Sequence, residues 1–314
     1  MKILVCHKLN HILTEKLKTT LRGHELVFAN DYDEAMKYAP DADVIIGMAV
    51  PGKIIKAAQK VKLIQAVSAG VDRIDLDVVK ESNIPLCNVR GAYSIPVAEH
   101  AIALIMTWEL KLLKQFEHVK SGKWTIVFHG EITGKVLGII GYGSIGHEIA
   151  KRGKSLGMKI LTIKRELQKQ KDDFVDFLGS MKDLDLVLKE SDYVVIALPL
   201  TKETYHLISE KELKTMKPNA VLVNISRGAI IDEKALIKAL KEKWIAGALL
   251  DVLEKEPPEP TNPLLSMDNV IITPHTSGIT EKAFERVANI VSENITRLEN
   301  GEKLLNQVDL IKEY

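Results

Sequence analysis

Three polar side chains in this sequence follow apolar, strand-like runs, close to the point where each run ends. They are Arg227, Glu256 and His275. A histidine, whose unperturbed pKa is ~6.5, can donate or accept a proton near neutral pH, and a neighbouring carboxylate stabilises its imidazolium form. A guanidinium presents a planar fork of donors to a carboxylate or a carbonyl oxygen. Together the three side chains could bind a small carboxylic acid and give a proton to a carbonyl group next to its carboxylate.

Their position strengthens this interpretation, because ligands of open parallel sheets bind at the carboxyl ends of the strands. Each residue also has an ordinary structural alternative. Arg227 could be half of a surface ion pair, Glu256 one of many loop acids, and His275 a histidine whose hydrogen bonds are satisfied after Pro274. Residue types and spacing alone leave both interpretations open.

A glycine-rich motif follows the apolar run at residues 136–140 and opens a helical run. In the dinucleotide-binding fingerprint, the first glycine permits a tight turn, the second lets the backbone approach a pyrophosphate, and the third allows close helix–strand packing. The phosphates then face the free N–H groups of the helix N-terminus. An ordinary glycine turn is the alternative. The predicted coenzyme-binding residues here are Gly141, Tyr142, Gly143, Ser144, Ile145 and Gly146.

The next strand-like run bears on which nicotinamide coenzyme is bound. About 20 residues after the glycines, an acidic side chain normally binds the adenine-ribose hydroxyls of NAD. Here the run at residues 160–163 is followed by Lys164 and Arg165, two cations that would attract a 2′-phosphate. We therefore favour NADP(H). NAD(H) stays possible, with the two cations solvated and Glu166 bound to a ribose hydroxyl.

Short apolar runs alternate with amphipathic ones along the chain, a pattern typical of an α/β fold with parallel sheets. Helices are predicted at residues 12–21 and 53–60, as one long helix at 97–121, and at 281–299, the last ending before Gly301. Strands are predicted at residues 3–6, 25–28, 44–47, 63–67, 85–88, 136–140, 160–163, 193–198, 220–225, 247–250 and 270–273.

Composition excludes several other classes of protein. The 314 residues are enough for two domains, and a formal net charge of +1 favours neither nucleic acid nor a membrane surface as a partner. Cys6 and Cys87 are expected to be free buried thiols of a cytoplasmic protein. The tryptophans Trp108, Trp124 and Trp244 are expected to pack in apolar surroundings. No metal site is predicted, since the histidines lack metal-ligand spacing.

Several ordered segments together resemble the D-isomer-specific 2-hydroxyacid dehydrogenase family. They are SAGVD at 68–72, PVAEH at 96–100, GKVLG at 134–138 continuing to Gly146, LPLT at 198–201, residues 224–232, residues 251–257, and TPH at 273–275. The similarity covers nearly the whole chain. It implies two Rossmann-like or flavodoxin-like domains with parallel sheets, separated by a cleft. Residues 1–97 with 279–314 would bind substrate, and residues 98–278 would bind the coenzyme.

The resemblance also implies roles for individual residues. Arg227 would bind the carboxylate and carbonyl of the substrate, His275 would be the general acid/base, and Glu256 would orient and charge His275. The Ser68, Ala69 and Gly70 turn would bind the substrate through its backbone. A homodimer through the 97–121 helix and the coenzyme domain is expected. Further coenzyme contacts would come from Leu198, Pro199, Thr204, Ile225, Ser226, Arg227, Asp251, His275, Ser277 and Gly278.

The activity implied is hydride transfer between NAD(P)H and a small 2-keto acid, giving the D-2-hydroxy acid. An NADPH-preferring glyoxylate/hydroxypyruvate reductase is the main prediction. Two alternatives stay open: an NAD-dependent D-3-phosphoglycerate dehydrogenase, and a dinucleotide-sensing protein like the family's corepressors. The loop at residues 47–51 lacks the Arg-Ser pair with which phosphoglycerate dehydrogenases hold the substrate phosphate. This absence counts against a phosphorylated substrate.

Overall fold

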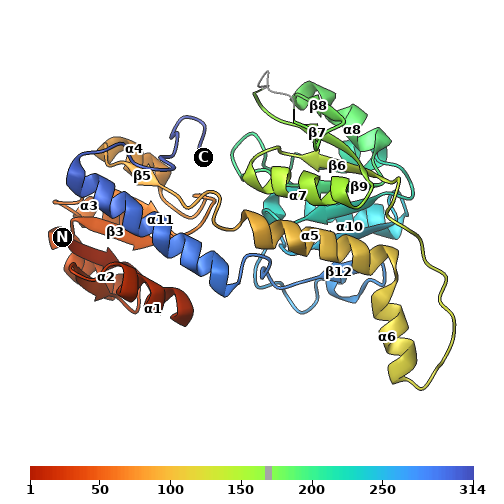
Figure 1. Cartoon of the computed structure of the whole chain (residues 1–314), viewed down its shortest axis with the longest axis horizontal. Coiled ribbons are helices and arrows are strands. Elements are labelled where there is room, and N and C mark those ends of the chain that lie inside the picture. The colour runs from red at the N-terminus through yellow and green to blue at the C-terminus, as the bar shows by residue number, and fades with distance from the viewer. Residues whose placement is uncertain (167–171) are drawn as a thin grey trace. The chain divides into compact units, whose positions relative to one another are not determined.

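The computed structural model describes residues 1–166 and 172–314 and divides into two compact units (Figure 1). One unit is Met1–Tyr93 with Ile279–Tyr314, and the other is Ser94–Gly278. From the sequence we predicted that the chain passes from the first domain to the second after Val97, whereas the second unit begins at Ser94. The reason is that helix α5 (Ser94–Glu109) already starts there, with Pro96 in its first turn, where a missing N–H costs no helical hydrogen bond.

The discontinuous unit is built on a five-stranded parallel sheet in the order β2-β1-β3-β4-β5, a flavodoxin-like arrangement. Its strands alternate their apolar side chains between two cores. Leu4 and Ile45 join one core, while Ile3, Val5 and Val44 join the other. Both faces are thus covered, as parallel sheets require. The strands are β1 (Lys2–Val5), β2 (Glu25–Phe28), β3 (Val44–Gly47), β4 (Leu63–Ala66) and β5 (Leu86–Cys87).

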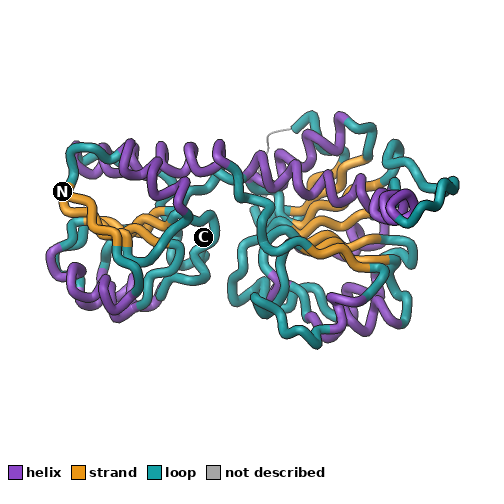
Figure 2. The backbone as a smooth tube through the Cα atoms, turned by 90° about the horizontal axis from the view of Figure 1, so that it is seen from below, coloured by secondary structure: helices purple, strands orange, loops and turns teal. Residues whose placement is uncertain are grey.

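Four helices of this unit begin at side-chain caps, with Asn10, Asp31, Asp75 and Thr280 accepting from N–H groups of the first turns. Helix α11 packs beside α1 and ends at Gly301, whose φ of 68° is the left-handed conformation of a C-terminal cap. Figure 2 shows these helices flanking the sheet. They are α1 (His11–Thr20), α2 (Tyr32–Tyr38), α3 (Gly52–Ala57), α4 (Leu76–Ser82) and α11 (Glu281–Asn300), with the 3₁₀ turn η1 (Ala39–Asp41).

The second unit contains a seven-stranded parallel sheet in the order β12-β11-β10-β9-β6-β7-β8. The chain starts at the central strand β6, runs outward to β7 and β8, and then returns to β9. The topological switch therefore lies beside β6, which is where ligands of such sheets bind. Strand β8 was missed from the sequence. The strands are β6 (Val136–Ile140), β7 (Lys159–Ile163), β8 (Phe177–Gly179), β9 (Tyr193–Ile196), β10 (Val221–Asn224), β11 (Gly247–Leu250) and β12 (Val270–Ile272).

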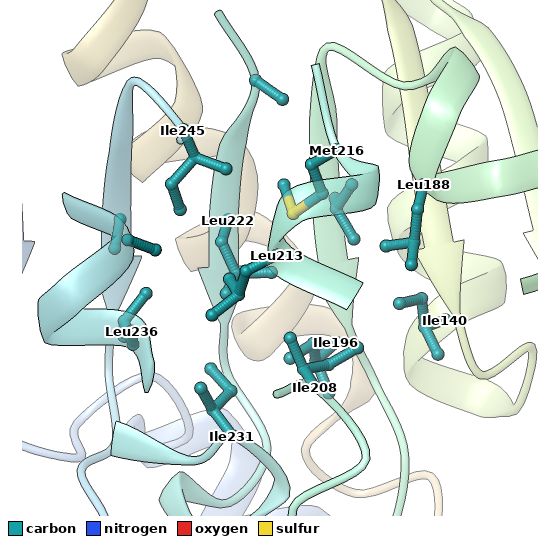
Figure 3. Packing of buried hydrophobic residues seen from close by; sticks show 14 of the residues in the cluster. Ile140, Leu188, Ile196, Ile208, Leu213, Met216, Leu222, Ile231, Leu236 and Ile245 are labelled. Atoms are coloured by element: carbon teal, nitrogen blue, oxygen red, sulfur yellow. The ribbon is translucent and has the colours of Figure 1, made fainter. Parts of the chain in front are cut away.

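The core of this unit lies where helices α9 and α10 cover β9 and β10 (Figure 3). Ile196 and Leu222 from the strands meet Leu213 and Leu236 from the helices, all almost fully buried. Besides α5 the helical segments are α6 (Leu112–Lys120), α7 (Ser144–Ser155), α8 (Leu184–Glu190), α9 (Glu210–Thr215) and α10 (Glu233–Lys241), with 3₁₀ turns η2 (Met181–Asp183), η3 (Gly228–Ile230) and η4 (Pro263–Ser266).

The single helix predicted at 97–121 was wrong, because the chain turns between α5 and α6. Lys111 adopts a left-handed φ of 52°, and its ammonium group donates to the carbonyl of Phe128. Helix α5 packs against α7, whereas no residue of α6 is buried. Packing against the rest of the unit therefore fixes the direction of α5 but does not require α6 to continue it. The expected packing of Trp124 was also wrong, since this side chain is 92% exposed.

The thiols of Cys6 and Cys87 are free and buried, which confirms that prediction. Burial raises the pKa of each thiol to about 12. Each helix in the described part of the chain is either too short or too polar to cross a lipid bilayer.

Candidate active site

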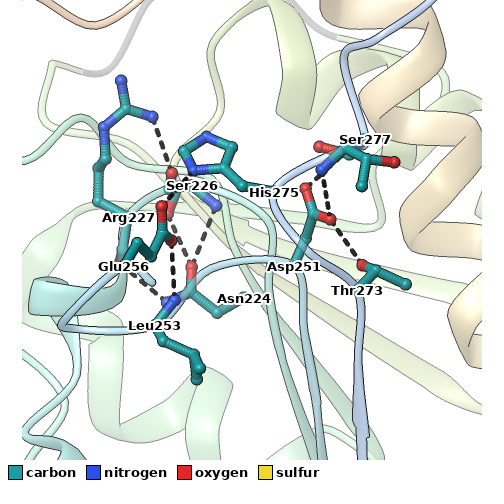
Figure 4. Close-up of polar contacts among 10 residues, drawn as sticks. Asn224, Ser226, Arg227, Asp251, Leu253, Glu256, Thr273, His275 and Ser277 are labelled. Atoms are coloured by element: carbon teal, nitrogen blue, oxygen red, sulfur yellow. Dashed lines mark hydrogen bonds and ion pairs between the residues drawn. The ribbon is translucent and has the colours of Figure 1, made fainter. Parts of the chain in front are cut away.

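The predicted catalytic side chains lie in three loops that follow adjacent strands of the seven-stranded sheet. Arg227 follows β10, Glu256 lies in the loop after β11, and His275 follows β12. Because these strands are parallel and hydrogen-bonded in register, their carboxyl ends meet at one edge of the sheet. In Figure 4, Arg227 and Glu256 lie on one side of His275, and Asp251 lies on the other.

His275 and Glu256 form a direct pair, with Nδ1 of the imidazole 2.7 Å from Oε2 of the carboxylate. The other carboxylate oxygen accepts a hydrogen bond from the backbone N–H of Leu253 at 3.0 Å. Since a carboxylate can only accept, Nδ1 carries the proton of this contact. The imidazole is thereby oriented with Nε2 available to a ligand.

The turn that carries Arg227 is fixed by its neighbours. Buried Asn224 donates to the carbonyl of Arg227 at 2.9 Å and accepts from the N–H and hydroxyl of Ser226. A Cβ on Gly228 would lie 1.9 Å from the carbonyl carbon of Leu253. The turn after β10 is therefore packed directly on the loop that carries Glu256. Asn224, Gly228 and Leu253 were not predicted as site residues. The motif at 224–228 carried the signal for the first two.

Asp251 anchors the backbone on both sides of His275. Its carboxylate is almost fully buried and accepts from the hydroxyl of Thr273 at 2.6 Å and from the N–H groups of Thr276 and Ser277 at 3.0 Å each. Its carbonyl accepts from the N–H of His275 at 2.8 Å. Asp251 was predicted as a coenzyme contact. The structure shows it holding the turn that presents the imidazole.

The glycine motif has the geometry that its fingerprint requires. Gly141 has a φ of 107°, and a Cβ on Gly146 would lie 2.2 Å from the carbonyl oxygen of Gly141. A side chain at either position would strain the backbone or clash with it, so the fold requires both glycines. A Cβ on Gly143, in contrast, would meet nothing within 4 Å. The open space in front of Gly143, at the N-terminus of α7 with no side-chain cap, fits a pyrophosphate.

The other predicted coenzyme contacts also lie just after strands of this sheet. Thr204 donates to the carbonyl of Pro199 at 2.7 Å and accepts from the N–H of Thr201 at 2.8 Å, which shapes the loop after β9. Leu198 and Pro199 follow β9, Ile225 and Ser226 follow β10, and Ser277 and Gly278 lie beyond β12.

Lys164 and Arg165 lie immediately after β7. The N–H of Lys164 donates to the carbonyl of Gly179, which extends the pairing with β8, and Arg165 forms an ion pair with Glu203. The hydroxyl of Tyr142 donates to Asp172 at 2.5 Å, and burial, reinforced by that carboxylate, raises the pKa of the phenol. Glu203 and Asp172 were not predicted, since neither belongs to a recognisable motif.

The predicted substrate turn lies after β4 in the other unit. Ser68 donates through its hydroxyl to the carbonyl of Gly70 at 2.7 Å, and Asn88 donates to the carbonyl of Ala69 at 2.9 Å. Within residues 1–166 and 172–314, the N–H groups of Ala69 and Gly70 have no protein acceptor. Over the same residues, no group of three or more His, Cys, Asp or Glu side chains has an arrangement that could hold a metal ion.

A family model described as D-isomer specific 2-hydroxyacid dehydrogenase, NAD binding domain, matches residues 102–277. This chain belongs to that family. The family resemblance inferred from the sequence is confirmed, and so is the α/β class with two parallel sheets. The protein is an NAD(P)-dependent oxidoreductase that acts on the CH–OH group of its donors.

Three known proteins are similar to this chain over most of its length. The chain is 40% identical over 262 residues to a glyoxylate reductase of Thermococcus litoralis, covering 81% of this chain and 78% of that protein. It is 35% identical over 315 residues to a D-3-phosphoglycerate dehydrogenase of Archaeoglobus fulgidus, covering 99% of this chain and 59% of that protein. The fold matches an NADPH-dependent glyoxylate/hydroxypyruvate reductase from Sinorhizobium meliloti with a TM-score of 0.89 at 23% identity, over 100% of this chain and 99% of that one.

Proposed function

We propose that the protein is an NADPH-preferring reductase of small 2-keto acids, with glyoxylate and hydroxypyruvate as its substrates. The observation that carries this proposal is the 2.7 Å contact between His275 and Glu256 at the carboxyl edge of the coenzyme sheet. An imidazole that a carboxylate holds in place can donate the proton that reduction of a carbonyl group needs. The similarity to glyoxylate reductases over most of the chain supports the choice of substrate.

When bound, the dihydronicotinamide would supply the hydride that this reduction of a keto acid needs. Arg227 binds the carboxylate through its forked donors and polarises the carbonyl. Nε2 of protonated His275 gives its proton to the carbonyl oxygen, so that one hydride and one proton complete the hydroxyl group. Glu256 stabilises the imidazolium before the transfer and holds the ring in place during it. The backbone N–H groups of Ala69 and Gly70 are assigned to the substrate carboxylate.

The dinucleotide is assigned to the glycine loop and the N-terminus of α7. The open space at Gly143 supports this assignment, because backbone that a pyrophosphate approaches has no room for a side chain. The 2′-phosphate of NADP is assigned to Lys164 and Arg165, which end β7 where NAD enzymes place an acidic residue. A forked guanidinium and a compact ammonium are both suited to a phosphate dianion.

The test is a panel assay that follows the absorbance of the reduced nicotinamide. The purified protein is mixed with glyoxylate, hydroxypyruvate or pyruvate, each with NADPH and with NADH. Turnover of glyoxylate and hydroxypyruvate with a higher kcat/KM for NADPH supports the proposal. Turnover with NAD and 3-phosphoglycerate alone would replace it with the phosphoglycerate dehydrogenase alternative. Coenzyme binding without any turnover would indicate a dinucleotide sensor.

We also propose a homodimer, formed through the segment that begins with α6. Trp124, Ile126 and Phe128 are 92%, 90% and 87% exposed, and Phe116 and Val119 on α6 are also exposed. So much exposed apolar surface within one short segment is typical of a face that another subunit covers. Light scattering coupled to gel filtration tests this, with the double variant Trp124→Ser/Phe128→Ser expected to be a monomer. A monomeric wild-type protein at micromolar concentration would contradict the proposal.

A further inference from the structure

His100 lies on α5, outside the predicted catalytic set, and reaches the loop that carries His275. Its Nε2 is 2.9 Å from the hydroxyl oxygen of Thr273 and 3.6 Å from a carboxylate oxygen of Asp251. The Thr273 hydroxyl donates its one hydrogen to a hydrogen bond with Asp251, so its oxygen accepts a hydrogen bond from the Nε2–H group of His100. The three side chains form one hydrogen-bonded chain from α5 to the turn after β12.

The carboxylate at the centre of this chain is a buried charge. The side chain of Asp251 is 0% exposed. Among the described residues, His100 is the one basic side chain within 4.0 Å of it. A buried carboxylate is stable only when donors satisfy its oxygens and a cation or strong dipole faces it. His100 is therefore the group that completes the surroundings of Asp251.

The turn that Asp251 holds is under backbone strain. His275 has a φ of 53°, in the left-handed region that residues other than glycine rarely adopt. Such a conformation persists only where the surroundings fix it. Here the fixing contacts are the N–H groups of Thr276 and Ser277, both bound to the carboxylate of Asp251 (Figure 4). A carboxylate free to rotate would release this turn and re-aim the imidazole.

We propose that His100 is a positioning residue for His275, acting through Thr273 and Asp251. The proposal rests on the proposed function, in which His275 is the proton donor. His100 does not touch the reacting atoms. Its effect is expected on the rate of the chemical step, because the imidazole must face the carbonyl oxygen, and much less on binding of coenzyme or substrate.

Two matched pairs of variants test the chain of hydrogen bonds. His100→Phe removes the donor, whereas His100→Gln keeps an N–H near the position of Nε2. Thr273→Val removes the hydroxyl at nearly constant volume, whereas Thr273→Ser keeps it. For each variant, kcat and KM are measured with glyoxylate and NADPH, coenzyme affinity by NADPH fluorescence, and amide hydrogen exchange over residues 272–278 by mass spectrometry.

We expect His100→Phe and Thr273→Val to lose about tenfold in kcat, the size of one lost hydrogen bond in the transition state, with KM and coenzyme affinity within about twofold. Exchange at Thr276 and Ser277 should accelerate in the same two variants. His100→Gln and Thr273→Ser should stay near wild type. If His100→Phe does not fold, the kcat and exchange rates of Thr273→Val test the proposal in its place. An unchanged kcat in the disrupting variants, or equal losses in both members of each pair, would overturn the proposal.

The outcome separates this inference from the proposed function. If the wild-type protein reduces no 2-keto acid, the proposed function fails. Hydrogen exchange alone then tests whether His100 holds the turn at His275 through Thr273 and Asp251. Faster amide exchange over residues 272–278 in His100→Phe but not in His100→Gln would support the hydrogen-bonded chain. Unchanged exchange in both variants would contradict it.

Discussion

Two ends of the coenzyme unit are built in different ways. The pair of His275 and Glu256 is fixed by partners within the unit: the N–H of Leu253, the buried carboxylate of Asp251 and the packed turn at Gly228. The cations after β7, in contrast, lie at the surface. Arg165 pairs there with Glu203, whose side chain is 75% exposed. The pair proposed for proton transfer is thus pre-organised, whereas Arg165, one of the two cations proposed to select the coenzyme, forms an ion pair with an exposed carboxylate.

This difference suggests how the two properties respond to substitution. Buried hydrogen bonds are costly to break, since each leaves an unsatisfied polar group. Exposed ion pairs contribute little and are readily exchanged. Changes at the first region should therefore abolish function, and changes at the second should retune it. The following predictions test this contrast, in order of decreasing effect.

The largest effect is expected from His275→Ala. Removing the proton donor should lower kcat/KM for glyoxylate by about 10²–10⁴-fold, the usual contribution of general acid catalysis. NADPH affinity, measured by fluorescence titration, should stay within about threefold of wild type, because the anchors of the turn are backbone groups. Activity that survives this substitution would place the proton donor elsewhere.

A pair of glycine variants separates the coenzyme from the fold. A methyl group on Gly143 enters open space, so Gly143→Ala should keep its melting temperature and lose about tenfold or more in NADPH affinity through a clash with the pyrophosphate. A methyl group on Gly146 meets the carbonyl of Gly141, so Gly146→Ala should lose about 1–3 kcal/mol of unfolding free energy. Calorimetry and fluorescence titration give both quantities. Normal coenzyme affinity in Gly143→Ala would remove the assigned pyrophosphate site.

Lys164→Asp should shift coenzyme preference toward NADH. Loss of a charged contact and gain of repulsion to the 2′-phosphate should change the ratio of kcat/KM values for NADPH and NADH by about 10–100-fold. Lys159→Asp is the matched control, since it makes the same charge change at the amino end of the same strand. The same ratio in Lys164→Asp and wild type would rule out this account of the 2′-phosphate.

The smallest effect is expected from Glu203→Gln, which removes the negative charge that pairs with Arg165. Affinity for adenosine 2′,5′-bisphosphate should rise by about two- to fivefold, as the loss of one surface ion pair allows. Affinity for 5′-AMP, which lacks the 2′-phosphate, should not change. Isothermal titration calorimetry measures both. A rise for both nucleotides would mean that Glu203 repels the ligand without regard to its 2′-phosphate.

Much of the fold could be predicted because both sheets are parallel and buried. Strands covered on two faces appear as short apolar runs, and β2, β3, β6 and β11 lie at the predicted residues. Strand β8 at the sheet edge escaped prediction because its surroundings are acidic and only three residues pair. The break between α5 and α6 escaped because it depends on packing: α5 has α7 as a neighbour, and α6 buries none of its residues.

The candidate site was predictable to the extent that its chemistry depends on residue type. His275, Glu256 and Arg227 stand out because each follows a strand-like run and carries a side chain suited to binding or protonating a keto acid. The supporting contacts could not be predicted, since Asn224, Leu253 and His100 act through position. The motif PVAEH marked His100 as part of a resemblance without showing what its ring contacts. The 2.9 Å contact between Nε2 of His100 and the hydroxyl oxygen of Thr273 is visible only in the folded chain.

The discontinuous unit has a consequence for how the chain folds during synthesis. Helix α11 supplies Phe284, Val287 and Val291 to the same core as Ile3 and Val5, so part of one face of the first sheet stays uncovered until residues 281–300 have left the ribosome. The segment 94–278, in contrast, is continuous and can fold as soon as it emerges. The discontinuous unit thus needs α11 to complete its core, and a nascent chain halted before residue 281 would present an apolar surface to chaperones.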